Sequence, residues 1–157
     1  MIPVLFALVL AQAPAKVPAL PKEIPMTAPA TGTFDVKVKP QQGDDADWGG
    51  FGRLSLDKRL HGDLEGTSRG QMLAEGDGKG DFGGYVALER VTGTLRGRQG
   101  SFVLMHAGTL VHRKPELTVT VVPGSGTGAL KDLAGRFRIL MAEGKHSYEF
   151  EYTLPAP

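Results

Sequence analysis

The stretch YVALERVTGTLRGRQGSFVLMHAGTLVH, residues 85–112, decides the fold. Apolar side chains alternate with polar or small ones through it, and Gly97–Gly100 interrupts the alternation in the middle. A period of two is typical of a β-strand, and a short glycine-bearing break between two such runs is typical of a hairpin turn. We therefore predict two long antiparallel strands over Tyr85–Arg96 and Ser101–His112, joined by a turn at Gly97–Gly100.

The same period of two recurs on both sides of this hairpin. Further strands are predicted over Thr33–Val38, Arg53–Leu60, Leu64–Leu73, Leu117–Val121, Phe137–Met141 and Ser147–Leu154. Helix is almost absent, with one helical turn predicted at Ala129–Leu133. Glycines within strands, such as Gly93 and Gly108, suit the bends of a closing sheet, and closure removes exposed strand edges. We predict an all-β fold, a small closed eight-stranded antiparallel barrel that is lipocalin-like in shape.

The residues before Ala30 differ in composition from the rest. Ile2–Ala11 is an apolar run too short to span a bilayer, and small residues follow it, which is typical of a secretory signal peptide. No Lys or Arg precedes the run. Residues 16–29 carry four prolines and are predicted to form an extended, disordered linker.

These patterns predict a signal peptide at residues 1–15, a proline-rich linker at 16–29 and a barrel domain at 30–157. Export to the periplasm or the medium follows from the signal peptide. A cytoplasmic location is the alternative if the leader is not cleaved.

Composition excludes several classes of function. Lys and Arg number 18 against 17 Asp and Glu in the 157-residue chain, so no excess of positive charge points to a nucleic acid. The chain has no cysteine, which excludes disulfides, thiolate metal sites and a cysteine nucleophile. No two of the four histidines have a tight zinc spacing. We expect no metal, no cofactor, no nucleic-acid partner and no stable membrane span.

Two short strings resemble catalytic motifs. GTSRG at Gly66–Gly70 fits the G-x-S-x-G pattern of serine hydrolases, but it lies within a predicted strand and no helix follows to form the nucleophile turn. GSGTG at Gly124–Gly128 resembles a phosphate-binding loop, but one helical turn follows it instead of a full helix. We interpret Ser68 as a small inward residue and the second string as a strand connection, and assign no catalytic residue.

A mismatch between polarity and strand face points to a candidate site. Lys58, Glu89, His106 and Tyr148 each fall on the same face as the apolar residues of their strands. That face lines the interior of a barrel, where unpaired charges are costly. Ionisable groups in such places are candidates for ligand contacts or acid–base work. We therefore predict a ligand-binding site in the lumen, formed by these four residues.

The strand that carries Glu89 leaves an alternative open. Val86 and Leu88 lie on its opposite face, so Glu89 faces solvent if those two residues point inward. The side that Glu89 occupies decides whether the lumen is polar. If Val86 and Leu88 point outward instead, they are candidates for a subunit contact in a homo-oligomer.

Six stretches of the chain carry a resemblance to a known family. They are ATGTFDVKV at Ala30–Val38, HGDLEGTSRGQML at His61–Leu73, GYVALERVTGTL at Gly84–Leu95, GSFVL at Gly100–Leu104, VVPGSGTGAL at Val121–Leu130 and GKHSYEFEYTLP at Gly144–Pro155. Together they resemble a bacterial family, domain-of-unknown-function family thirty-two twenty-four. The resemblance implies a barrel similar to that of allene oxide cyclase, whose relatives bind hydrophobic or aromatic molecules and steer their cyclisation or coupling. The family has no assigned activity, so the resemblance carries no residue roles across.

Three functions remain open, in the order in which we rank them. The first is a binding protein that holds a small hydrophobic ligand in the lumen without chemistry. The second is a cyclase or isomerase in which Glu89 or His106 moves one proton of a bound hydrophobic substrate. The third is a structural or interaction protein whose barrel is solid. The sequence does not decide whether the protein is an enzyme.

Overall fold

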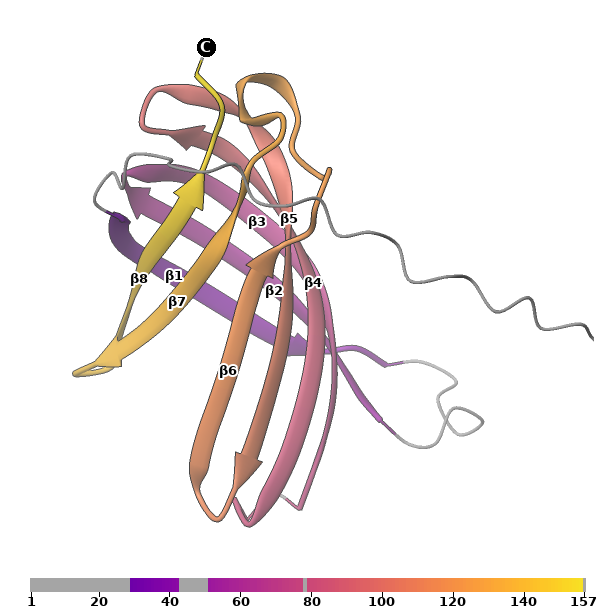
Figure 1. Ribbon diagram of the computed structural model, residues 1–157. Helices are drawn as coiled ribbons and strands as arrows, with labels where there is room; N and C mark the ends of the chain where they lie inside the picture. The colour runs from indigo at the N-terminus through magenta and orange to yellow at the C-terminus, as the bar shows by residue number, and fades with distance from the viewer. Residues whose placement is uncertain (1–28, 43–50, 78, 157) are drawn as a thin grey trace, which may run out of the picture.

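Alternating side chains build eight strands that close on themselves into an antiparallel barrel, in the order β1 to β8 (Figure 1). The structure is a computed structural model that describes residues 29–42, 51–77 and 79–156. The strands are β1 (Ala30–Pro40), β2 (Gly52–Gly62), β3 (Leu64–Gly76), β4 (Phe82–Leu95), β5 (Arg98–Val111), β6 (Lys114–Val121), β7 (Ala134–Ala142) and β8 (Lys145–Thr153). A 3₁₀ turn, η2 (Gly128–Leu130), lies between β6 and β7. The predicted all-β barrel is confirmed.

The predicted signal peptide at residues 1–15 lies outside the described residues, and so does the linker at 16–29 apart from Pro29. Both therefore stay predictions. The described chain enters the barrel directly, since β1 begins at Ala30, and β1 pairs with β2 on one side and with β8 on the other. These two pairings place the first and last strands side by side, which closes the sheet.

β4 and β5 form the predicted hairpin and pair in register along their full length. The turn is shorter than predicted, because only Arg96 and Gly97 join the strands and Arg98 already belongs to β5. The prediction of a turn at Gly97–Gly100 is therefore wrong. Arg96 and Gly97 have φ angles of 44° and 83°, which is typical of the two-residue turn whose twist matches that of the flanking strands. The Arg96 guanidinium bonds to Asp63 at 2.9 Å, which helps to hold this left-handed residue in place.

One half of the barrel interior is filled by apolar side chains. The buried core consists of Ala30, Phe34, Leu60, Leu64, Val91, Leu95, Phe102, Leu104, Val119, Val121, Leu130, Leu133, Phe137, Tyr148 and Phe150. The ring centroid of Phe137 lies 4.9 Å from that of Tyr148 and 5.5 Å from that of Phe150. Aromatic pairs attract each other at these separations. Leu130 of η2 belongs to the same core, so the connection between β6 and β7 packs onto this end of the barrel.

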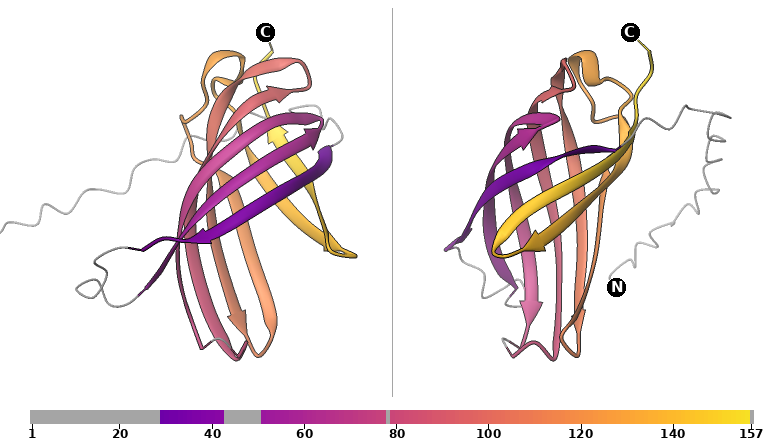
Figure 2. Two further views of the ribbon diagram at one scale, coloured as in Figure 1. Left: turned by 180° about the vertical axis from the view of Figure 1, so that it is seen from behind. Right: turned by 90° about the vertical axis from the view of Figure 1, so that its left-hand side faces the viewer.

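The other half of the barrel is split between β6 and β7. Among the described residues these strands share a single register pair, Thr120 with Arg136. Figures 1 and 2 show β7 and β8 diverging from β6 beyond this point. The divergent part of β6 contains Pro115, and proline is confined in sheets to edges and strand ends because it has no N–H to donate. The barrel is therefore closed at one end and open along one side at the other.

The close approach of β3 and β4 gives the first testable prediction. Gly93 pairs with Gly66, and a Cβ on Gly93 would clash with the backbone carbonyl oxygen of Glu65. We expect Gly93→Ala to lower the free energy of unfolding by about 1–3 kcal/mol, because the two strands must separate. Gly84→Ala on the same strand is the control, since its Cβ would meet only the Gly108 carbonyl oxygen, at 3.8 Å. Urea unfolding measures both variants, and equal midpoints would contradict the close approach.

Candidate functional site

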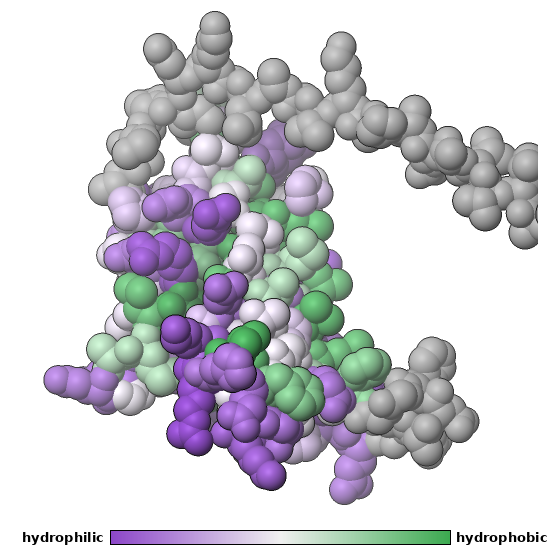
Figure 3. Space-filling model, turned by 60° about the horizontal axis from the view of Figure 1, so that its bottom comes forward, coloured by the Kyte–Doolittle hydropathy of each residue, from purple (hydrophilic) through white to green (hydrophobic). Residues whose placement is uncertain are grey.

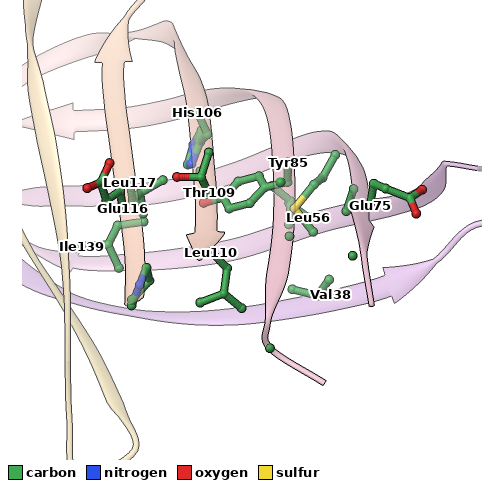
Figure 4. Close-up of a pocket in the computed structure, with 18 of the residues that line it drawn as sticks. Val38, Leu56, Glu75, Tyr85, His106, Thr109, Leu110, Glu116, Leu117 and Ile139 are labelled. Carbon is green, nitrogen blue, oxygen red and sulfur yellow. The ribbon is translucent and has the colours of Figure 1, made fainter. Parts of the chain in front are cut away.

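The split half of the barrel contains a cavity of about 850 Å³, to which all eight strands contribute. Most of its wall is apolar. The larger apolar side chains are Phe34, Val36, Val38, Leu56, Met72, Phe82, Leu110, Leu117, Ile139 and Met141. Figure 4 shows Leu110 of β5 and Ile139 of β7 facing the same space from different strands. Figure 3 turns this end of the molecule toward the viewer, with hydrophilic residues gathered at the tip beside hydrophobic ones.

Four polar side chains meet at the inner end of this cavity. Lys58 Nζ lies 2.7 Å from Glu89 Oε2, and Ser68 Oγ donates a hydrogen bond to Glu89 Oε1. His106 Nε2 lies 3.0 Å from Glu89 Oε2. Glu89 is only 1% exposed and His106 3%, so the cluster is buried. Lys58 and His106 line the cavity, whereas Glu89 does not.

The tilt of the strands brings these four residues together. Lys58 of β2 pairs directly with Ser68 of β3. Glu89 lies two residues from the position opposite Ser68 on β4, and His106 lies two residues from the position opposite Glu89 on β5. In a closed barrel the strands are tilted and staggered, so residues at one height shift along successive strands. The cluster is therefore one layer of the barrel that spans β2 to β5.

Glu89 is held as a carboxylate by its neighbours. Burial by itself raises the pKa of Glu89, but the contact with His106, the charge of Lys58 and the hydrogen bonds from Lys58 and Ser68 together lower this pKa to about 2. Glu89 is therefore ionised at neutral pH and forms a buried ion pair with Lys58. Lys58 Nζ also lies 5.0 Å from the centroid of the Phe34 ring, within the distance of a cation–π contact.

His106 and Tyr85 bring unpaired polar groups to the site. The approach of His106 Nε2 to Glu89 is too poorly aligned for a hydrogen bond, so this buried nitrogen has no hydrogen-bond partner among the described residues. Tyr85 lines the cavity, and burial and the charge of Glu89 raise the pKa of its hydroxyl, which stays protonated. Gly108 stands opposite Tyr85 and leaves room for its ring, which a Cβ would hit. Figure 4 shows the side chains of His106 and Tyr85 directed into the cavity.

The structure brings together three of the four residues predicted from the sequence. Lys58, Glu89 and His106 lie in one cluster. Of the two orientations left open for Glu89, the structure has the inward one, because Val86 and Leu88 are both 56% exposed on the outer face. Whether the three residues bind a ligand stays a prediction.

Tyr148 lies apart from this cluster, in the filled half of the barrel. Its hydroxyl accepts a hydrogen bond from the Leu64 backbone N–H at 2.9 Å, and its ring packs on Phe137. The side chain is 1% exposed and does not line the cavity. Tyr148 shares the inward face with the cluster, as predicted, but the contacts that the structure shows for it are structural.

Sequence patterns do not assign Ser68 and Tyr85 to the site. Ser68, in the GTSRG string, lies in the middle of β3 and bonds to Glu89, so it does not occupy a nucleophile turn. Tyr85 lies four residues from Glu89 on the same face of β4, and this spacing is the signal that would have included it. For Ser68 the sequence contains no such signal, because its contact with Glu89 depends on the register between β3 and β4.

Metal-ligand clusters and membrane-spanning helices are both absent from the described part of the chain. The residues described there contain no group of three or more His, Asp or Glu side chains arranged to hold a metal ion. Within the same residues, no helix is both long and apolar enough to cross a membrane.

The fold and the site define a class of protein, a small antiparallel β-barrel with a buried Lys–Glu pair between a filled half and a hollow half. The sequence profile of the family described as "Protein of unknown function (DUF3224)" matches residues 30–152. The chain belongs to this family, which confirms the predicted resemblance.

A solved structure supports the same assignment. The crystal structure of a protein with unknown function from the DUF3224 family from Shewanella oneidensis MR-1 is similar to this chain, with a TM-score of 0.76 and 42% sequence identity. The similarity covers 85% of this chain and 100% of that chain. The search of curated proteins finds no match.

Removing one partner of the ion pair should strongly lower the free energy of unfolding. Lys58→Met leaves Glu89 ionised and buried without its ammonium partner, and we expect the free energy of unfolding to fall by about 3–5 kcal/mol. The double variant Lys58→Met/Glu89→Gln removes both charges and should recover most of this loss, because no unpaired charge remains. Urea unfolding measures both variants. A Lys58→Met protein as stable as the wild type would show that the pair is not desolvated.

The lowered pKa of Glu89 predicts sensitivity to acid. The pKa of Glu89 is about 2 in the folded protein against an ordinary value of 4.5, so its contribution to stability is fully present above about pH 4.5 and is lost as the pH falls through 2. This difference corresponds to about 3 kcal/mol of stability. Glu89→Gln lacks this contribution at every pH. The difference in unfolding free energy between the wild type and Glu89→Gln should therefore shrink by that amount from pH 5 to pH 2, and a constant difference would contradict the assignment.

Proposed function

We propose that this barrel binds a small hydrophobic molecule in the cavity of its split half. The observation that carries the proposal is the cavity itself, with about 850 Å³ of space and a mostly apolar wall. Ligand pockets typically span roughly 300–1,000 Å³ and combine apolar walls with a few polar groups that orient the ligand. Lys58, His106 and Tyr85 are such groups here.

Small residues support the proposal because they keep this half of the barrel hollow. An eight-stranded barrel is just wide enough for side chains to fill its interior, and large side chains do so in the other half. Ala74, Gly76, Gly83 and Gly84 line the cavity instead. The space is thus a consequence of the residues placed there, and a hydrophobic ligand would supply the packing contacts that they omit.

The split between β6 and β7 supplies a route into the cavity. Leu117 of β6 lines the cavity from one side of the split, and Ile139 and Met141 of β7 line it from the other. Met141 is 70% exposed and Leu117 41%, so apolar side chains are presented to solvent at this opening. Exposed apolar side chains beside a pocket are typical of surfaces that contact a ligand.

A cyclase or isomerase is the second candidate, and the contact between His106 and Glu89 is the observation that favours it. The negative charge of a carboxylate beside an imidazole stabilises the positive charge that the ring carries once it has accepted a proton. Glu89 itself is poorly suited as a general base, because its pKa of about 2 lies far from neutral pH and the residue does not line the cavity. Under this hypothesis His106 moves the proton, and the charge of Glu89 stabilises the protonated ring.

The solid-barrel alternative has less support, since half of the interior is hollow. Val86 and Leu88 are exposed on the outer face of β4, where a contact between subunits would need them, and that contact stays a prediction. Export also stays a prediction, because the leader lies outside the described residues.

Filling the opening of the cavity should weaken binding. Leu117→Trp adds an indole to the cavity wall, and we expect the uncharged hydrophobic dye Nile red to bind at least about tenfold more weakly than to the wild type. Leu88→Trp, on the outer face of β4, is the matched control and should leave the dissociation constant unchanged. Fluorescence titration measures binding, and circular dichroism checks that both variants fold. The proposal fails if the wild type binds no dye or if Leu117→Trp binds it equally well.

A further inference from the structure

We propose that the ligand of this cavity carries an uncharged acceptor oxygen, a ketone carbonyl or a hydroxyl, that accepts a hydrogen bond from Lys58 at the inner end. The inference rests on the proposed binding function and names the chemical class of the ligand, an uncharged molecule with an apolar body and one polar oxygen. Three features of the site carry it: the donors at the inner end, the net charge there and the charge in the outer part of the cavity.

Lys58 keeps donors after its pairing with Glu89. A lysine ammonium has three N–H groups, and the one hydrogen bond that Lys58 makes among the described residues goes to Glu89 Oε2. The side chain lines the cavity, so its remaining N–H groups are within reach of a ligand there. The Tyr85 hydroxyl also lines the cavity and bonds to none of the described residues. Buried donors without a partner destabilise a protein, and an acceptor oxygen on the ligand removes that cost.

The net charge at the inner end favours an uncharged group over a carboxylate. The charges of Lys58 and Glu89 cancel at 2.7 Å. A ligand carboxylate would compete with Glu89 for the same ammonium and leave one negative charge unpaired in apolar surroundings, where charges are costly. A ligand ammonium would leave one positive charge in excess. An uncharged oxygen adds a hydrogen bond without adding a charge.

The outer part of the cavity also disfavours anions. Away from the inner end, the charged residues that line the cavity are Glu75, Asp77 and Glu116, which are acidic, and Lys79. Clefts lined by an excess of one charge repel ligands of the same sign, an effect that salt screens. A fatty-acid-like ligand is therefore opposed at both ends of the cavity, whereas a ketone or alcohol of the same chain length is opposed at neither.

The test compares compounds that share one alkyl chain and differ at one end. 1-Decene, 2-decanone, 1-decanol, decanoate and decylammonium are titrated against the wild-type protein at pH 8, above the usual pKa of histidine, by displacement of Nile red. We expect 2-decanone and 1-decanol to bind at least about tenfold more tightly than decanoate and decylammonium. Equal or tighter binding of either charged compound overturns the inference.

A variant locates the oxygen. In Lys58→Met/Glu89→Gln the apolar wall is kept and the donor is removed, so 1-decene should bind within about twofold of its wild-type affinity. The advantage of 2-decanone over 1-decene should fall at least about fivefold relative to the wild type. An unchanged advantage would show that the oxygen does not lie at Lys58 and would overturn the inference. Thermal unfolding followed by circular dichroism establishes that the double variant is folded before titration.

The outcomes separate this inference from the proposed function. If neither 1-decene nor Nile red binds the wild type, the proposed function fails and the inference fails with it. If both bind and the charged compounds are preferred, the cavity binds hydrophobic molecules and only the class of polar group named here is wrong.

Discussion

The buried ion pair between Lys58 and Glu89 is the interaction on which the rest of the interior depends. It lies at the boundary between a filled half, packed with rings such as those of Phe137 and Phe150, and a hollow half. A buried pair gives little stability over apolar side chains of the same volume, yet losing one partner is costly. An apolar layer at this height would fill the barrel without burying charges that must be paired. Stability alone therefore does not explain the pair, which is consistent with the binding function proposed for the cavity.

Strand length decides where the barrel opens. β4 and β5 each have 14 residues, whereas β6 has eight and β7 and β8 have nine. At the open end β4, β5 and β6 extend past β7 and β8, and β6 keeps one register pair with β7 among the described residues. Beyond that pair β6 and β7 diverge, which is visible in Figure 1. The polar layer lies at the inner end of this opening, so the same geometry supplies the cavity and places Lys58 and His106 in its wall.

Alternation along the strands predicted which residues face inward, and the structure agrees for Lys58, Glu89, His106 and Tyr148, all of which are buried. It did not predict which of them meet. Tyr148 has the same polarity mismatch as the other three, but its hydroxyl bonds to backbone in the filled half. The turn of the β4–β5 hairpin shows a similar limit. Both Gly97 and Gly100 suit a turn, so the sequence pattern does not fix where the turn lies. In the structure the turn is at Arg96 and Gly97, because Arg96 adopts the left-handed conformation.

By itself the sequence determined the strands, their inward faces and the class of fold, because side-chain direction alternates along any extended backbone and a period of two is legible without knowledge of the partner strand. Only the tertiary structure decided which inward residues share a height and where the barrel splits. Stagger and tilt belong to the closed ring of strands as a whole, since each pairing constrains the next. That is why the contact of Ser68 with Glu89 and the distance of Tyr148 from both emerge only once all eight strands are in register.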